Sequence, residues 1–350
     1  MIKYLGSKRR LVPTIERIAA ASGARRALDL FTGTPRVAQA FKSRGVDVTA
    51  VDTARYSEVF ARCYVETDAG SVDHGELAAA IDHLNALPGR PGYVTETFCR
   101  QARFFQPFNG QRIDAVRQAI ETEHAGSPLY PILLTSLIEA ADRVDSTTGV
   151  QMAYVKQWAP RSYRPLHLRP PPLLKGRGRA VRGDALQVAA GLGEFDLAYL
   201  DPPYNQHRYF TNYHVWETLV AWDAPEHYGV ACKRADASDP ATRSPFNSRR
   251  TIHRALQQVI DAVRCRLLVL SYNDESWITA DELREMCHRF EDVTTLSFRS
   301  PRYVGARIGI HDPSGRKVGS VSHLTNRELL VVAGPASLVR RATGALADTA

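Results

Sequence analysis

Apolar runs and helical patterns alternate along the chain and predict both strands and helices. An apolar run at residues 26–31 leads into a turn at residues 32–35, a helical pattern from Val37 to Phe41, and a second apolar run at residues 46–51. A strand, a tight turn, a helix and a strand make a βαβ unit, which is typical of parallel α/β sheets. Further strands are predicted at residues 195–200, 267–272, 293–298 and 327–333, and helices at residues 251–263 and 279–290.

Residues 66–145 have a different pattern. Their apolar positions recur at helical spacing, and no run there favours a strand. We therefore predict a helical insertion at residues 66–145 within one sheet-based domain formed by residues 1–65 and 146–335. Residues 336–350 are small and polar enough to predict a flexible, loosely held tail. The expected helices of the insertion cover residues 72–85, 112–123 and 130–144.

Length and composition are consistent with one enzyme core that carries an insertion. The chain has 350 residues, of which 44% are hydrophobic, so disorder along the whole chain is excluded. The apolar runs are much shorter than the ~20 residues of a membrane span. Residues 1–8 lead into a polar segment without a secretory signal, and five scattered cysteines argue against a disulfide framework or a zinc cluster. We expect a cytoplasmic protein with free thiols and no membrane partner.

The chain is basic, and its bases are unevenly placed. Lysine and arginine total 45 against 37 acidic residues, a net charge of +8, which favours a polyanionic partner. Residues 146–183 contain no acidic residue, and Tyr154, Trp158 and Tyr163 are interleaved with the bases. A charge run is usually a solvated face, but this combination favours a strap along a nucleic-acid backbone. The bases of the strap are Lys156, Arg161, Arg164, Arg169, Lys175, Arg177, Arg179 and Arg182.

Two further basic segments are expected to touch phosphates, although solvated loop charge is an equal alternative for each single residue. We expect residues 233–250 to form a mobile flap and residues 302–317 to form a hairpin that turns at residues 312–315. The bases of the two segments are Lys233, Arg234, Arg243, Arg249, Arg250, Arg302, Arg307, Arg316 and Lys317. The residues for which we predict nucleic-acid contact are Lys156, Arg161, Arg164, Arg208, Arg249, Arg250 and Arg302.

The tetrapeptide Asp201-Pro202-Pro203-Tyr204 directly follows a predicted strand. Parallel α/β sheets bind ligands at the carboxyl ends of their strands, although a turn that happens to hold two prolines would look the same. A nucleobase amine is a poor nucleophile because its lone pair is delocalised into the ring. The Asp201 carboxylate and the Pro202 carbonyl could accept its N–H bonds and free that lone pair, while Pro203 stiffens the path to the Tyr204 ring, on which the base would stack. The nucleotide would have to be flipped out of a duplex.

An amine activated in this way could accept a methyl group, and the methyl donor that we expect is S-adenosylmethionine. Gly33 lets the backbone pass close to a ligand, and the helix that follows can face the ligand's carboxylate. Asp52, at the end of the second strand, is placed to hold ribose hydroxyls, as acidic residues do in nucleotide-binding folds. Asp184 is a candidate contact to the adenine of the cofactor, with a surface turn as the equal alternative.

Along nearly its whole length the chain resembles the D12 class of DNA adenine-N6 methyltransferases, which contains the Dam-type enzymes. The resemblance implies a Rossmann-like class I methyltransferase sheet that binds S-adenosylmethionine. It also implies that the amino-terminal motif contributes to the cofactor site. The motifs that carry the resemblance are residues 3–8 (KYLGSK), 29–34 (DLFTGT), 201–204 (DPPY), 205–219, 271–273 and 326–330. The residues implied at the cofactor are Tyr4, Lys8, Phe31, Gly33, Thr34, Asp52, Asp184 and Asp201.

The order of the motifs resembles that of the family's alpha group, in which target recognition lies between the cofactor turn and the catalytic tetrapeptide. This implies that residues 66–145, with the basic strap after them, recognise the target. A helical cap that only packs on the sheet is the alternative, and residues 130–144 are apolar enough to favour packing. The family's turn usually has a second glycine where Pro35 stands here. We expect Thr34 to cap the helix and Pro35 to be its first residue, although weakened cofactor binding is the other possibility.

These observations predict a site-specific enzyme that methylates adenine N6 in double-stranded DNA. The alternatives are cytosine-N4 methylation, a DNA-binding protein without catalysis, and a methyltransferase acting on RNA or on a protein amide. We expect a monomer on DNA, with a cognate restriction enzyme as a separate chain. His207, His214 and His253 lack metal-ligand spacing with any acid or thiol, so no metal is predicted.

Overall fold

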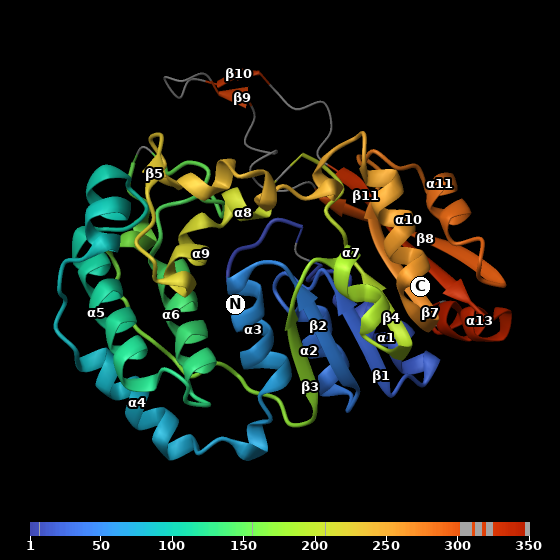
Figure 1. The fold of residues 1–350 in the computed structure, drawn as a ribbon, viewed down its shortest axis with the longest axis horizontal. Coiled ribbons are helices and arrows are strands. Elements are labelled where there is room, and N and C mark those ends of the chain that lie inside the picture. The colour runs from blue at the N-terminus through green and yellow to red at the C-terminus, as the bar shows by residue number, and fades with distance from the viewer. Residues whose placement is uncertain are drawn as a thin grey trace. The chain divides into compact units, whose positions relative to one another are not determined.

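Figure 1 shows a computed structural model of the chain, which describes residues 1–6, 8–155, 157–206, 208–301, 310–311, 317–319 and 325–346. The chain folds into two compact units, each assembled from separate stretches of sequence. The helical unit consists of Met1–Tyr4, Thr32–Gly183 and Arg208–Arg243, and the sheet unit of Leu5–Phe31, Asp184–His207 and Ser244–Ala350.

The sheet unit is built on five hydrogen-bonded strands. β1 (Arg26–Leu30), β4 (Glu194–Leu200) and β7 (Arg264–Asn273) run parallel, while β11 (Thr325–Gly334) runs antiparallel to β7 and to β8 (Asp292–Pro301) (Figure 1). The apolar runs that predicted β1, β4, β7 and β11 are largely buried and the run of β8 is mostly half-buried, and the sheet confirms the α/β class. The helices of this unit are α1 (Val12–Ser22), α7 (Ala185–Val188), η5 (Ala189–Gly191), η8 (Pro245–Asn247), α10 (Ile252–Ala262), α11 (Ala280–Met286) and α13 (Ala336–Gly344).

The register of β4 decides where the tetrapeptide at residues 201–204 leaves the sheet. Leu200, the last residue of β4, pairs with Leu30 at the end of β1 and with Leu270 in β7. Asp201 therefore leaves the sheet at the carboxyl edge of two parallel strands. This is the edge at which we predicted ligand binding.

The expected tail at residues 336–350 is wrong for its first part, because Ala336–Gly344 form the helix α13. Leu338, Val339 and Ala342 are buried at helical spacing, and the Arg341 guanidinium donates to the carbonyl oxygen of Ala21, 2.7 Å away, at the end of α1. Small residues predicted a loose segment, but docking of an apolar stripe stabilises the helix.

The helical unit contains one parallel pair of strands, β2 (Asp47–Asp52) and β3 (Gly178–Arg182). The three helices predicted for the insertion are confirmed as α4 (His74–Ala86), α5 (Pro107–His124) and α6 (Tyr130–Val144) (Figure 1). The other elements are α2 (Arg36–Ser43), α3 (Arg55–Ala61), η1 (Arg62–Glu66), η2 (Ala69–Ser71), η3 (Thr95–Gln101), η4 (Pro160–Tyr163), α8 (Tyr209–Asn212), α9 (His214–Ala221), β5 (His227–Tyr228), β6 (Lys233–Arg234), η6 (Ala235–Ser238) and η7 (Pro240–Thr242).

β3 corrects the expectation that the whole acid-free stretch is an extended strap. Its sequence, GRAVR, is too short and too rich in arginine to predict a strand, yet it pairs with β2 from Gly178 to Arg182. A side-chain carbon on Gly178 would lie 2.4 Å from the carbonyl oxygen of Val65, so only glycine fits this close approach. Tertiary pairing, which is invisible in local sequence, forms this strand.

Three smaller expectations are also resolved. Pro35 is the N-cap of α2 and not its first helical residue, and the helix begins at Arg36. α11 begins behind a capping box formed by Thr279 and Glu282, and it ends at Met286, earlier than the expected residue 290. In the expected hairpin, β9 (Ile310–His311) and β10 (Lys317–Gly319) pair antiparallel, and the turn at residues 312–316 lies outside the described residues.

No helix within the described ranges is long and apolar enough to cross a membrane.

Candidate active-site residues

A cluster of charges in the sheet unit is centred on Lys8. The Lys8 Nζ lies 3.2 Å from Oδ1 of Asp201 and 3.1 Å from Oε2 of Glu328. Lys8 is buried, and the Asp201 side chain keeps 20% of its surface exposed, so the carboxylate remains reachable. Three separate segments of sequence thus bring one ammonium between two carboxylates.

The environment of this cluster changes the acidity of its members. Burial raises the pKa of Asp201 to about 6, against the pull of the Lys8 ammonium, and the Glu328 carboxylate adds to the rise. Burial alone would lower the pKa of Lys8, but Asp201, with Tyr204 and Glu328, raises it well above its ordinary value. At neutral pH Lys8 is therefore an ammonium and Asp201 a carboxylate that accepts hydrogen bonds.

Tyr204, at the end of the tetrapeptide, lies beside the same lysine. The Lys8 Nζ lies 5.4 Å from the centroid of the Tyr204 ring, and that ring lies 5.5 Å from the ring of Tyr272 at a tilt of 59°. Pro202 is buried and Pro203 partly buried. Burial raises the pKa of Tyr204 to about 12, so its ring stays neutral. An aromatic face next to an acceptor carboxylate is suited to a flat, amine-bearing base.

The helical unit holds a second strand-end carboxylate, Asp52. Its Oδ2 accepts a hydrogen bond from the Gly33 amide at 2.8 Å, and its Oδ1 accepts one from the Ala54 amide at 3.0 Å. Burial raises the pKa of Asp52, although these backbone N–H groups oppose the rise. A carboxylate has about four acceptor sites, so a ribose hydroxyl can still bind to it.

Gly33 and Tyr4 define the wall beside Asp52. Gly33 has φ +52°, and a side-chain carbon there would lie 2.9 Å from both Cε1 and Oη of Tyr4. The Tyr4 ring stacks on Tyr213 with centroids 4.7 Å apart, and its hydroxyl lies 3.4 Å from the Tyr56 hydroxyl. The turn thus places the Asp52 carboxylate and the Tyr4 ring beside a glycine that has no room for a side chain.

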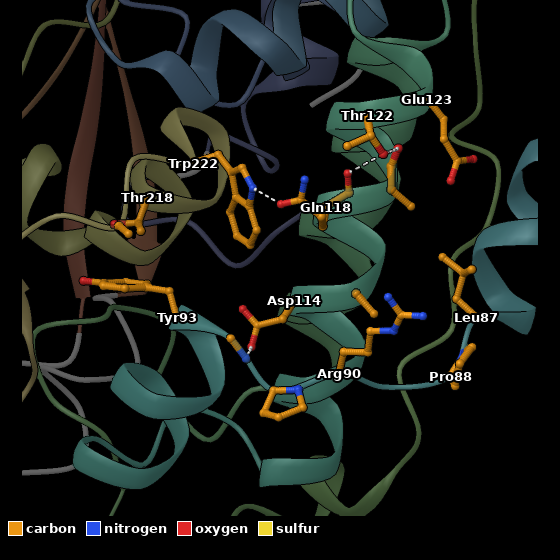
Figure 2. A pocket seen from close by; sticks show the side chains of 15 residues that line it. Leu87, Pro88, Arg90, Tyr93, Asp114, Gln118, Thr122, Glu123, Thr218 and Trp222 are labelled. Atoms are coloured by element: carbon orange, nitrogen blue, oxygen red, sulfur yellow. Dashed lines mark hydrogen bonds between the residues drawn. The ribbon is translucent and has the colours of Figure 1, made fainter.

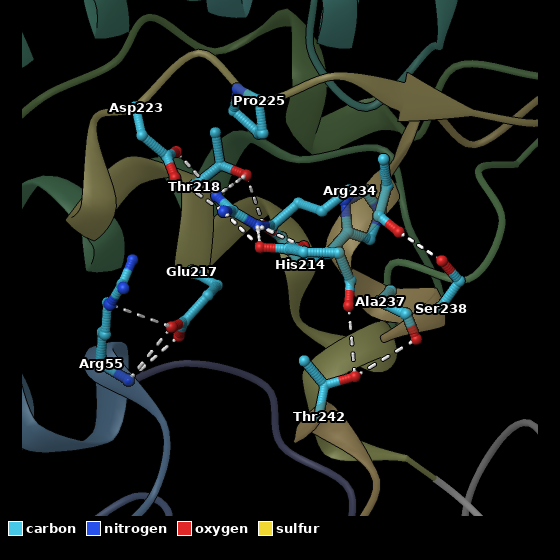
Figure 3. Close-up of polar contacts among 12 residues, drawn as sticks. Arg55, His214, Glu217, Thr218, Asp223, Pro225, Arg234, Ala237, Ser238 and Thr242 are labelled. Carbon is cyan, nitrogen blue, oxygen red and sulfur yellow. Dashed lines mark hydrogen bonds and ion pairs between the residues drawn. The ribbon is translucent and has the colours of Figure 1, made fainter. Parts of the chain in front are cut away.

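Glu217 is a functional candidate that the sequence analysis missed. It lies buried on α9, and its Oε2 accepts a hydrogen bond from the Arg55 amide, at 3.0 Å, at the first residue of α3 (Figure 3). Burial raises the pKa of Glu217 to about 7. It acts as the acceptor that α3 lacks at its own N-cap, Ala54. Its place in the segment 205–219 that resembles the family was the available signal.

The remaining predicted cofactor residues have local structural roles. Phe31, with φ +70°, packs edge-on against Phe246 with centroids 5.0 Å apart. Thr34 is buried. Asp184 caps α7 by accepting a hydrogen bond from the Leu186 amide at 2.9 Å, which corresponds to the turn that we held as its alternative.

Several bases predicted for nucleic-acid contact are engaged inside the helical unit. Arg161 donates to Asp145 at 2.6 Å, and Arg208 donates to the carbonyl oxygen of Ala237 at 2.7 Å. Arg234 is buried and lies 2.7 Å from the carboxylate of Asp223 (Figure 3). The carboxylate of Asp236 also lies 2.7 Å from it. Arg164, Arg249 and Arg250 are exposed, whereas Lys156 and Arg302 lie outside the described residues.

A cavity of about 580 Å³ opens in the helical unit beside α5 (Figure 2). Two of its polar lining groups are already paired: the Asp114 carboxylate accepts hydrogen bonds from the amides of Gly92, Val94 and Thr95, and Gln118 accepts one from the Trp222 indole at 3.1 Å. The space shares no residue with the Asp52 site. No group of three His, Cys, Asp or Glu side chains suited to a metal occurs in the part of the chain that the structure describes.

Comparison with known proteins gives the family. The model of the D12 class N6 adenine-specific DNA methyltransferases matches residues 4–286, and the chain belongs to this family. It is similar to the type II methyltransferase M.NlaIII of Neisseria lactamica, with 30% identity over 83% of this chain and 88% of that one.

Other relatives are longer. The modification methylase StsI of Streptococcus sanguinis is 27% identical over 85% of this chain and 48% of its own. M.FokI of Planomicrobium okeanokoites is 25% identical over 81% of this chain and 46% of its own length. The chain thus spans about half the length of these two relatives. Among solved structures, it is similar, with a TM-score of 0.32 and 7% identity, to the magnesium protoporphyrin IX methyltransferase of Synechocystis, over 92% of this chain and 78% of that one.

Proposed function

We propose that the chain transfers a methyl group from S-adenosylmethionine to N6 of a target adenine in double-stranded DNA. The observation that carries the proposal is the Asp201 carboxylate, partly buried at the carboxyl end of β4 and close to the Tyr204 ring, in a chain of the D12 family. Family membership supports a DNA substrate. To family membership the proposal adds three points: N6 of adenine as the target, S-adenosylmethionine as the methyl donor, and flipping of the target base.

Asp201 and Pro202 would act on the amine of the flipped base. The carboxylate and the carbonyl each accept one N–H bond, which localises the nitrogen lone pair outside the ring. Tyr204 would stack against the base and hold the nitrogen in place. The lone pair forms the new N–C bond, and the methylated nitrogen then releases one proton to solvent water. No covalent bond to the protein is required.

S-adenosylmethionine would supply an electrophilic methyl group whose C–S bond breaks with both electrons staying on sulfur. Asp52 would hold the ribose hydroxyls, and Gly33, which carries no side chain, would let the backbone approach the donor. Tyr4 would form an aromatic wall, buttressed by its contacts with Tyr213 and Tyr56. These residues bind and orient the donor.

Exposed bases would hold the DNA backbone, and the insertion would read the target. Arg164, Arg249 and Arg250 are the predicted phosphate contacts that remain exposed in the structure. Residues 66–145, which hold α4 to α6, remain our candidate for target recognition. The names of the relatives as type II methyltransferases support a partner restriction enzyme on a separate chain.

The test is transfer of labelled methyl from S-adenosylmethionine to unmethylated genomic DNA, followed by nucleoside analysis, with Asp201→Ala alongside. We expect labelled N6-methyladenine from the wild type and none from the variant. Labelled N4-methylcytosine would keep the amine chemistry and overturn the adenine assignment. Binding of duplex DNA with no transfer would support a protein that binds without catalysis, and preference for RNA in competition would overturn the DNA assignment.

A further inference from the structure

Glu328 is a second carboxylate on Lys8 that the proposed reaction leaves without a role. It projects from β11 and lies 3.1 Å from the Lys8 Nζ, while Asp201 lies 3.2 Å from the same nitrogen. The Glu328 side chain is only 15% exposed. Because a buried ion is costly unless paired, this second negative charge needs a physical reason.

Charge balance does not supply that reason. Lys8 and Asp201 alone would make a neutral pair, and Glu328 leaves the cluster with one net negative charge. A like charge also makes it harder for Asp201 to ionise, since the Glu328 carboxylate contributes to its raised pKa. This energetic disadvantage suggests that the role of Glu328 lies in where it places the Lys8 ammonium relative to Asp201.

The geometry of an ammonium explains the arrangement. Lys8 has three N–H donors that point in different directions. With Asp201 as its one carboxylate partner, Lys8 could bridge both carboxylate oxygens. Instead, the Lys8 Nζ is shared between Oε2 of Glu328 and Oδ1 of Asp201. This places the ammonium to one side of Asp201 and leaves Oδ2 available to accept an N–H bond.

We infer that Glu328 is a positioning residue for the proposed methyl transfer: it anchors Lys8 so that the ammonium meets Asp201 through one oxygen and leaves the other for the amine of the target base. The inference rests on the proposed function. Glu328 also offsets part of the Lys8 charge, so Asp201 remains a stronger hydrogen-bond acceptor than it would be beside an unopposed ammonium.

The electrostatic consequence has a definite sign. Because the Glu328 charge raises the pKa of Asp201, removing that charge lowers this pKa. The pH at which the methyl-transfer rate falls on the acid side should then move to a lower value. A change in packing alone does not predict this movement. The titratable groups that act on Asp201 or on its partners are Asp29, Lys8, Tyr199, Tyr204, Glu275 and Glu328.

The test compares Glu328→Gln with Glu328→Asp in the full chain. Glutamine keeps the size of the side chain and loses its charge, whereas aspartate keeps the charge and is shorter. We expect Glu328→Gln to lower kcat by roughly 10- to 100-fold, the range for a lost charged hydrogen bond, with little change in KM for S-adenosylmethionine. Glu328→Asp should recover part of that loss. Glu285→Gln removes one charge from the exposed surface of α11 in the same unit and is the matched control.

A second readout does not need turnover. The pKa of the Asp201 carboxyl, followed by carbon NMR in aspartate-labelled protein, should be lower in Glu328→Gln than in the wild type and unchanged in Glu285→Gln. Equal kcat values for wild type and Glu328→Gln would overturn the inference, as would a larger loss in Glu328→Asp than in Glu328→Gln, which indicates packing. A wild type that transfers no methyl while the NMR shift is present would instead overturn the proposed function.

Discussion

The two units each hold a partly buried carboxylate at the end of a parallel strand, but by different means. Asp52, the last residue of β2, accepts hydrogen bonds from the backbone amides of Gly33 and Ala54. Asp201, after β4, is paired with the side-chain ammonium of Lys8. Backbone amides are part of the turn and cannot leave, whereas a lysine side chain can change its partner. The comparison suggests that Asp52 is built to hold a ligand and Asp201 to act on one.

The same difference appears in the neighbours. The Asp52 site is closed by Gly33 and stacked tyrosines, which give shape but no exchangeable charge. The Asp201 site has Lys8 and Glu328, whose charges set how strongly the carboxylate accepts a hydrogen bond. Substitutions at the first site should therefore change affinity, and those at the second should change rate.

The largest effect is expected from Asp201→Asn. The amide offers an N–H group where the target amine needs an acceptor, so kcat should fall by roughly 100- to 1,000-fold, as when one preorganised polar group is lost from an active site. Binding of S-adenosylmethionine, measured by calorimetry, should change little. Asp281→Asn, on exposed α11, is the control. Loss of cofactor binding in Asp201→Asn would break the proposed division between the two sites.

Asp52→Asn should have the opposite signature. Losing a charged acceptor for ribose hydroxyls should raise KM for S-adenosylmethionine by roughly 10- to 100-fold, while kcat at saturating cofactor stays close to that of the wild type. Steady-state kinetics measure both values, and Asp47→Asn at the exposed start of β2 is the matched control. A fall in kcat with unchanged KM would contradict the binding role of Asp52.

The dependence on pH should follow Asp201. Only the ionised carboxylate accepts both the Lys8 and the amine N–H bonds, and burial sets its pKa at about 6. The rate should therefore be constant above that value and fall as the pH drops through it, about tenfold for each further unit. Single-turnover rates measured between about pH 5 and about pH 8 would show this fall in rate. A rate that does not change over this range would contradict the role of an ionised Asp201.

The smallest expected effect is that of Gly33→Ala. An L side chain at φ +52° should lower the free energy of unfolding by about 1–2 kcal/mol, and the added carbon would also push on Tyr4. Gly23→Ala, at φ +70° with no atom within 4 Å of the added carbon, carries the same backbone cost without the clash. Urea unfolding should show the larger loss in Gly33→Ala, because only that variant adds the clash with Tyr4. Weaker binding of S-adenosylmethionine in Gly33→Ala, but not in Gly23→Ala, would support the assignment of the Gly33 turn to the cofactor site.

Local patterns identified the elements whose sequences are strongly apolar or follow a clear helical spacing. The runs that became β1, β4 and β7 are apolar enough to require burial on both faces, and the helices α4 to α6 follow their apolar spacing. β3 and α13 were missed because neither is strongly apolar. β3 is held by pairing with β2, and α13 by docking of its buried stripe and the bond from Arg341 to α1.

The charged residues show the same limit. Sequence counted Arg161, Arg208 and Arg234 among bases free to meet a polyanion, but their partners come from residues that only folding brings near. Glu217 and Glu328 were missed for the converse reason, because an isolated acidic residue on a helix or strand looks like solvated surface until its partner is seen.

Sequence by itself determined the α/β class, the position of Asp201 to Tyr204 after a buried strand, and the places of Gly33 in a turn and of Asp52 at a strand end, since strand periodicity and turn chemistry depend on neighbouring residues. Tertiary structure alone decided which charges meet. Lys8, Asp201 and Glu328 are separated by more than a hundred residues along the chain, and electrostatic interaction depends on distance in space.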